Sequence, residues 1–471
     1  MRPRNTRPRG LSSLVTLALT GVAAATTVVP AHAVTVPCDT AALIAAINNA
    51  NTNVDPVIDL EPYCLYEVTA PYMPGADDGL PPITNNNPGG VTINGHNATI
   101  KRVGSTPFRL FEVGVVTPAA APGRLTLNDL TVMNGQPGIN IGGGAVLVRN
   151  NSTFAGTNVA FQGGTANIGG GARFMTGSTA TLTDSRISDN RTTGGASSGG
   201  GLQSEGQVTL VNTHVTSNRA RIGGGIGHPS GTLTINGGSV KHNTAFDAGG
   251  GISSDASGTL NVTGTSITDN RVTTGGLGSG TGGGVFIGAG GTQNFTNSTI
   301  EGNTVTVRDA TDGGGGIFAL AGALTLDNTK VKGNKLIGEG GLGAGISAFG
   351  GTVNLMNASD VTGNLAAGRY SLGGGIYTTG LINTPTVTVN RSAIDRNKVS
   401  GTGSRGAGIY NAGGTYDLTD ASVQFNVAPD APAPGGIWTS TAITSVTNTT
   451  IANNTPTNCL YSPAPVTSCV G

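Results

Sequence analysis

From Leu182 to Asn454 the chain repeats one block ten times: an apolar residue, a second apolar residue five or six positions later, and an asparagine three positions after the second. The apolar residues stand in short strings such as Thr232–Ile235, where polar and apolar residues alternate as in a half-buried strand. Helical periodicity is absent from the blocks, so the pattern predicts short strands joined by corners. The ten asparagines are Asn190, Asn218, Asn243, Asn270, Asn303, Asn334, Asn364, Asn397, Asn426 and Asn454.

A glycine-rich tripeptide followed by an apolar residue alternates with these blocks. It recurs about every 29 residues, a period typical of stacked supersecondary units. Each repeat then offers three strands: one after the glycines, one around the first apolar position, and one that ends at the asparagine. Stacked, these strands predict an all-β, single-domain parallel β-helix, right-handed by the chirality of parallel crossovers, with a rise of about 4.8 Å per coil. The apolar residues after the glycines are Ala145, Ala172, Leu202, Ile226, Ile252, Val285, Ile317, Ile346, Ile376, Ile409 and Ile437.

The glycines and asparagines have backbone roles in this prediction. Glycine permits a positive φ at the corners, and asparagine is the next most tolerant residue for a left-handed bend. Asparagine side chains stacked at one corner also hydrogen-bond from coil to coil as a ladder. We therefore expect all ten asparagines to be structural.

The two ends of the chain differ from the repeats. Four arginines, an apolar run from Leu11 to Val29 and the string Ala31–Ala33 predict a secretory signal peptide over residues 1–33, and hence a secreted or cell-surface bacterial protein. No other apolar stretch is long enough to span a bilayer. The predicted division is 1–33, signal peptide; 34–123, an N-terminal cap with a short helix at Ala41–Ala50 and irregular coils; 124–455, β-helix repeats; and 456–471, a disulfide-tied cap.

Cysteines and charge narrow the classes of function. Four cysteines allow three pairings, and the local pairs Cys38–Cys64 and Cys459–Cys469 are favoured because the repeats hold the two ends far apart. Without the four signal-peptide arginines the chain carries 21 Lys and Arg against 25 Asp and Glu, which excludes nucleic acid as a partner. No metal-ligand spacing, P-loop or dinucleotide fingerprint occurs, so we expect neither a metal nor a cofactor.

Aromatic residues gather in one predicted column. The residue after each post-glycine apolar position should point outward, beginning with Val146. Near the C-terminal end this column holds Phe286, Phe318, Tyr377, Tyr410 and Trp438. Two interpretations stay open: an exposed strip that stacks on sugar rings or docks a partner, and a satellite core covered by long loops.

Polar residues fill the same outward face nearer the N-terminus. Glu205 and Asp255 have the same offset on coils two apart, roughly 9.6 Å from each other, near the upper limit for an inverting pair of catalytic carboxylates. His228 lies on the coil between them, where it would orient a water molecule, and Arg173 lies one coil before Glu205. The alternative is that these are solvated polar residues on a rod. No column contains the three carboxylates that a calcium-dependent lyase would need.

Two resemblances cover residues 34–471. Gly-Gly-Gly-Ile followed by Ile-x-x-Asn resembles the paired short repeats of the chlamydial polymorphic membrane protein family, and the string Ile93–Ile100 resembles early coils of pectate-lyase-like β-helix proteins. The first implies an exported adhesin, and the second implies polysaccharide lyases and hydrolases.

Our leading hypothesis is extracellular surface recognition, adhesion or a structural role, with a polysaccharide or a cell-surface protein as partner. The alternative is a carbohydrate-active enzyme that uses Glu205, Asp255, His228 and Arg173.

Overall fold

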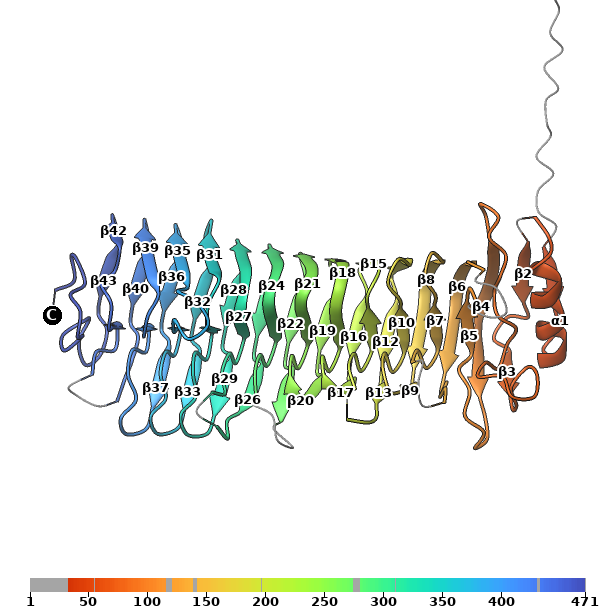
Figure 1. The fold of residues 1–471 in the computed structure, drawn as a ribbon, viewed down its shortest axis with the longest axis horizontal. Helices are drawn as coiled ribbons and strands as arrows, with labels where there is room; N and C mark the ends of the chain where they lie inside the picture. The colour runs from red at the N-terminus through yellow and green to blue at the C-terminus, as the bar shows by residue number, and fades with distance from the viewer. Residues whose placement is uncertain are drawn as a thin grey trace, which may run out of the picture.

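The computed structural model describes residues 33–54, 56–115, 121–138, 142–195, 197–273, 280–309, 311–429 and 433–470. Over these residues the chain is a rod of stacked parallel strands with a single helix, α1, at its N-terminal end (Figure 1). The predicted all-β parallel β-helix with a short capping helix is confirmed. Of the predicted signal peptide, residues 1–32 lie outside the described residues.

The helix closes the first coil. α1 (Thr40–Ala50) begins at Asp39, whose carboxylate accepts a hydrogen bond from the Ala42 amide at 2.7 Å. Its buried face carries Leu43, Ile47 and Ala50. The helix contacts β1 (Val34–Val36), β2 (Val57–Leu60) and β3 (Leu65–Val68), so its apolar face covers strands that would otherwise end in water.

Thirty-four strands form one continuous sheet along the rod. We describe its three faces as sheets 1, 2 and 3. Sheet 1 holds the strand after each glycine corner, sheet 2 the alternating strand, and sheet 3 the strand before each ladder asparagine. Sheet 1 comprises β5 (Phe111–Val113), β7 (Val146–Val148), β10 (Ala172–Phe174), β14 (Leu202–Ser204), β30 (Ile346–Ala348), β34 (Ile376–Thr378), β38 (Ile409–Asn411) and β41 (Ile437–Thr439). Four long strands bend from sheet 1 into sheet 2, namely β18 (Ile226–Asn236), β21 (Ile252–Thr263), β24 (Val285–Thr296) and β27 (Ile317–Asp327).

The rest of sheet 2, after β1 and β2, is β11 (Thr179–Thr183), β15 (Gln207–Val211), β31 (Thr352–Met356), β35 (Thr386–Asn390), β39 (Thr415–Thr419) and β42 (Ser445–Thr447). Three strands run from sheet 2 into sheet 3: β4 (Val91–Arg102), β6 (Arg124–Met133) and β8 (Thr153–Gln162). Sheet 3 continues from β3 through β12 (Arg186–Ser188), β16 (His214–Thr216), β19 (Ser239–Lys241), β22 (Ser266–Thr268), β25 (Thr299–Glu301), β28 (Lys330–Lys332), β32 (Asp360–Thr362), β36 (Ala393–Asp395), β40 (Ser422–Gln424) and β43 (Thr450–Ala452).

A fourth, nine-stranded sheet follows the asparagine corner, where we predicted no strand. From β20 to β37 its strands bury small or branched side chains, such as Val272, Val305 and Leu336, in a separate hydrophobic cluster. So short a run shows too little alternation to be recognised in the sequence. Its members are β9 (Thr165–Ala166), β13 (Arg191–Thr192), β17 (Arg219–Ile222), β20 (Thr244–Ala248), β23 (Arg271–Thr273), β26 (Thr304–Thr306), β29 (Lys335–Ile337), β33 (Leu365–Ala367) and β37 (Lys398–Ser400).

The ten asparagines form the predicted ladder. Both the backbone amide and the side-chain amide of Asn270 donate to Oδ1 of Asn303, at 2.9 and 3.0 Å. The side chain of Asn303 in turn donates to the Ile267 carbonyl at 3.0 Å. The same pattern runs from Asn190 to Asn454, which donates to Asn458 of the C-terminal segment. Each buried asparagine thus satisfies backbone groups of its own corner and of its neighbour.

The left-handed bend lies one residue before the asparagine rather than at it. Asp269, next to Asn270, has a φ of 54°, and the ladder asparagines are not among the residues with positive φ. The glycine corners do need glycine: Gly282 has a φ of 64°, and a Cβ there would lie 2.3 Å from the Val285 carbonyl oxygen. Our assignment of the bend to asparagine was therefore wrong by one position.

The two disulfides join the predicted pairs, Cys38 with Cys64 and Cys459 with Cys469. Each ties a segment at one end of the rod, 26 and 10 residues apart in sequence respectively. Within the described residues, no helix is long and apolar enough to cross a membrane.

Candidate functional site

Two of the four predicted catalytic residues pair with each other. Arg173 and Glu205 form an ion pair at 2.9 Å, with side-chain exposures of only 15% and 13%. Two nitrogens of Arg173 donate to the two carboxylate oxygens, at 3.0 and 3.2 Å. This pairing across neighbouring coils engages both oxygens of Glu205.

His228 is fully buried inside the rod, not beside solvent. Its ring nitrogens lie 3.2 Å from the carbonyl oxygens of Ser204 and Thr259. Burial lowers its pKa, which keeps the ring neutral. Asp255 stays exposed on β21. The structure therefore gives His228 no water to orient between Glu205 and Asp255, and our interpretation of its role was wrong.

The aromatic column is a continuous stack of rings. Phe286 stacks on Phe318 with ring centroids 5.8 Å apart, Tyr377 on Tyr410 at 5.6 Å, and Tyr410 on Trp438 at 4.1 Å. Phe349, outside the predicted column, fills the gap between Phe318 and Tyr377, at 5.0 and 6.0 Å.

The stack is a covered cluster with partly exposed ends. Phe318 and Tyr377 are buried, at 4% and 8% exposure, in a cluster that also contains Leu342 and Phe349. Phe286, Tyr410 and Trp438 are half-buried. Because the rings contact one another and Phe318 and Tyr377 are buried, the strip of five exposed faces is not present, and the satellite core is the better description. The first member of the predicted outward column is also wrong by one residue. Val146 pairs with Ala172, and Leu147 pairs with Arg173, so Leu147 and not Val146 belongs to the column of Arg173.

Sheet 2 carries a different regular surface, which we call the threonine/asparagine face. It consists of the outward residues of nine successive coils, held in register from β11 to β39. All are partly or fully exposed, and only Asp327 and Asp417 among them are charged. The first column is Thr179, Gln207, Thr232, Thr259, Thr292, Ala323, Thr352, Thr386 and Thr415. The middle column is Thr181, Thr209, Thr234, Asn261, Asn294, Thr325, Asn354, Thr388 and Asp417, and the third is Thr183, Val211, Asn236, Thr263, Thr296, Asp327, Met356, Asn390 and Thr419.

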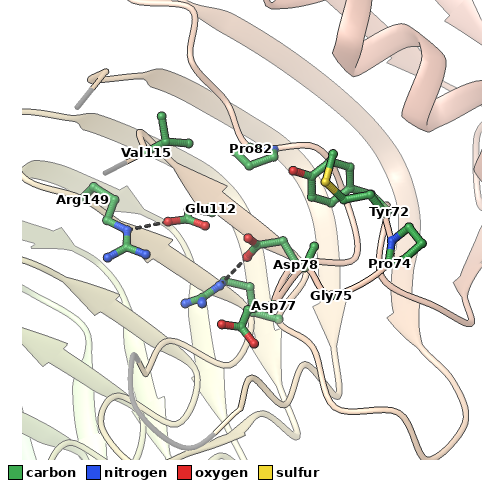
Figure 2. A pocket seen from close by; sticks show the side chains of 12 residues that line it. Tyr72, Pro74, Gly75, Asp77, Asp78, Pro82, Glu112, Val115 and Arg149 are labelled. Carbon is green, nitrogen blue, oxygen red and sulfur yellow. Dashed lines mark hydrogen bonds and ion pairs between the residues drawn. The ribbon is translucent and has the colours of Figure 1, made fainter. Parts of the chain in front are cut away.

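A pocket of about 320 Å³ lies near the N-terminal end, under the loop between β3 and β4 (Figure 2). Four charged residues cross it in a chain. Arg109 donates to Asp78, Arg149 donates to Glu112, and the carboxyl groups of Asp78 and Glu112 lie between the two arginines and influence each other's pKa. The rest of the lining includes Tyr72, Met73, Pro74, Asp77 and Pro82. We call these residues the charged pocket.

The backbone fixes the members of the charged pocket. The Arg109 amide donates to the Asp77 carbonyl at 2.8 Å, and the Gly79 amide donates to the Arg109 carbonyl at 2.7 Å. Glu112 lies on β5, and the Arg149 amide just beyond β7 donates to the Val113 carbonyl at 2.9 Å. Strand pairing thus places Glu112 and Arg149 on neighbouring coils.

The two carboxyl groups have opposite pKa shifts. Burial raises the pKa of Asp78 to about 8, and the hydrogen bond to Glu112 adds to that shift while Arg109 opposes it. Burial alone would raise the pKa of Glu112, but the hydrogen bond from Asp78 and the charges of Arg109 and Arg149 hold it below its usual value. At neutral pH Asp78 is therefore the protonated and Glu112 the ionised member of the pair.

We did not predict the charged pocket. Its ion pairs join residues 31 and 37 positions apart, in a part of the chain without the repeat. One signal was available: the string Phe108–Val113 places Arg109 and Glu112 among four apolar residues, in a chain with only 11% charged residues. Charged residues inside a buried strand need partners. Among the described residues, no group of three or more His, Cys, Asp or Glu side chains is arranged to hold a metal ion.

The match to a family model agrees with the fold. Residues 116–305 match the family model of a right-handed beta helix region. A tailspike protein mutant of E. coli bacteriophage HK620 in complex with a pentasaccharide is 12% identical, with a TM-score of 0.42 over 91% of this chain and 76% of that one. PfbA, a surface adhesin of Streptococcus pneumoniae, is 14% identical, with a TM-score of 0.38 over 90% of this chain and 89% of that one. No curated protein matches. The chlamydial resemblance stays a prediction, and the right-handed parallel β-helix is the fold of this chain.

Proposed function

We propose that the protein acts outside the cell in surface recognition and binds uncharged polysaccharide along the threonine/asparagine face. The observation that carries the proposal is the register of nine coils, which repeats neutral hydroxyl and amide groups along the rod. The extracellular setting rests on the predicted signal peptide and on the two disulfides.

A repetitive face suits a repetitive ligand. Hydroxyl and amide groups donate and accept hydrogen bonds, as sugar hydroxyls do, and successive coils offer them about every 4.8 Å. Neighbouring side chains already order each other, because the Asn294 side chain donates to Asn261 at 2.9 Å. Many weak contacts along one polymer add up to useful avidity. The near absence of charge favours a neutral polymer.

The test introduces charge and bulk into the middle column of the face. We expect Thr234→Lys, Thr325→Lys and Thr388→Lys combined to reduce retention of residues 34–471 on insoluble neutral polysaccharides by at least tenfold. The matched control is Thr268→Lys with Thr362→Lys, two half-buried positions on sheet 3, which should bind as the parent does. Equal retention of both variants and the parent, or no retention of the parent, would overturn the proposal.

A further inference from the structure

The charged pocket has the size and composition of a small-ligand site. Its volume of about 320 Å³ lies within the range of ligand pockets, and one side is formed by Tyr72, Met73 and Pro74. The ring of Tyr72 therefore offers an amphipathic wall next to buried charges (Figure 2). Nothing in the threonine/asparagine face contributes to it.

The pocket still has donors to offer. Arg149 uses Nε for Glu112, and neither of its terminal nitrogens has a hydrogen-bond partner among the described residues. Its side chain is 15% exposed. Two parallel donors remain for a ligand, held in a fixed direction by the ion pair.

The charge balance of the pocket disfavours a charged ligand. Arg109 and Arg149 line the pocket together with the acids Glu112 and Asp77, while the raised pKa of Asp78 leaves that carboxyl group uncharged at neutral pH. The positive and negative charges therefore cancel. Directional hydrogen bonding, and not net charge, is what the pocket can recognise.

We propose that the charged pocket binds a single uncharged sugar residue, such as the end or a side branch of a polysaccharide. Arg149 donates to one ring hydroxyl and Glu112 accepts from its neighbour, while the ring packs against Tyr72. A carboxylate and a guanidinium side by side match two adjacent hydroxyl groups. The site is independent of the threonine/asparagine face, so either can fail alone.

The test titrates residues 34–471 with neutral monosaccharides and with uronic acids by calorimetry. We expect saturable binding of at least one neutral sugar, weakened tenfold or more by Arg149→Lys, which keeps a cation for Glu112 but loses the paired donors. Tyr72→Ala should weaken binding and Tyr72→Phe should retain most of it, which separates packing against the ring from unfolding. The control is Arg221→Lys, which changes an ion pair with Asp247 on a regular coil and should leave affinity unchanged.

Three outcomes would overturn this inference: no binding of any neutral sugar, preference for uronic acids, or equal weakening by Arg149→Lys and Arg221→Lys. The two proposals are distinguishable because Arg149→Lys should leave retention on insoluble polymer unchanged. Conversely, the lysine variants of the threonine/asparagine face should still bind the monosaccharide.

Discussion

The regular coils and the first coils stack by the same parallel pairing but bury different polar groups. From Asn190 to Asn454 the buried corner holds uncharged amides, each bonded to the next coil. Near the N-terminus the buried polar groups include charged side chains, with Arg109 bonded to Asp78 and Arg149 to Glu112. Repetition lets the interior amides satisfy one another, whereas the irregular coils leave donors such as those of Arg149 facing a pocket. We therefore expect a selective ligand site in the irregular N-terminal coils and not in the regular repeats.

Removing one amide from the ladder should have the largest effect on stability. Asn303→Ala removes the acceptor of the Asn270 backbone amide, one of the two acceptors of the Asn270 side chain, and a donor to the Ile267 carbonyl. We expect the free energy of unfolding to fall by about 3–6 kcal/mol, measured by urea denaturation. Asn48→Ala on the exposed side of α1 is the control and should change it by less than about 0.5 kcal/mol. A small loss for Asn303→Ala would mean that the ladder is not cooperative.

Breaking the ionic chain should cost nearly as much but act locally. Arg109→Met removes the cation beside Asp78 and the bond from Arg109 to the Gly142 carbonyl at 2.8 Å. We expect a loss of about 3–5 kcal/mol, with faster amide hydrogen exchange near β3 and β5 and unchanged exchange in β22. Arg369→Met, at an exposed and distant pair, is the control. Uniform loss of protection along the rod would show that the two regions unfold as one unit.

Stability should depend on pH through Asp78. Its pKa is about 8 in the folded protein against 3.8 normally, so between those values the folded state holds a proton that the unfolded chain releases. The free energy of unfolding therefore falls as pH rises from about 4 to 8. Asp78→Asn keeps a donor for Glu112 and should remove most of this slope in urea titrations at pH 5 and 8. An unchanged slope would assign the effect to another group.

The smallest effect is expected for the ion pair on the regular coils. Glu205→Gln should lower the free energy of unfolding by no more than about 1 kcal/mol, because glutamine keeps a carbonyl oxygen that accepts a hydrogen bond from Arg173. It should also leave polysaccharide retention unchanged. Loss of any hydrolytic activity in this variant would contradict our assignment and restore the catalytic interpretation of Glu205.

Much of the rod could be read from the sequence, because its determinants are periodic. The glycine period of about 29 residues predicted the coil length, the recurring corner asparagines predicted the ladder, and a short capping helix was predicted at Ala41–Ala50. The fourth sheet was missed because a strand such as Arg271–Thr273 is too short for a pattern. The aromatic column was found, but its burial depends on Phe349, which belongs to no column.

The sequence by itself determined the repeat, the parallel β-helix, the corner asparagines and the local disulfides, since each depends on residues close together or at a fixed period. Only the tertiary structure decided that Arg173 neutralises Glu205, that His228 points inward, and that Asp78 and Glu112 meet between Arg109 and Arg149. Those outcomes depend on which residues of irregular loops and neighbouring coils come into contact. That contact is set by strand register and burial in three dimensions, which no period in the chain encodes.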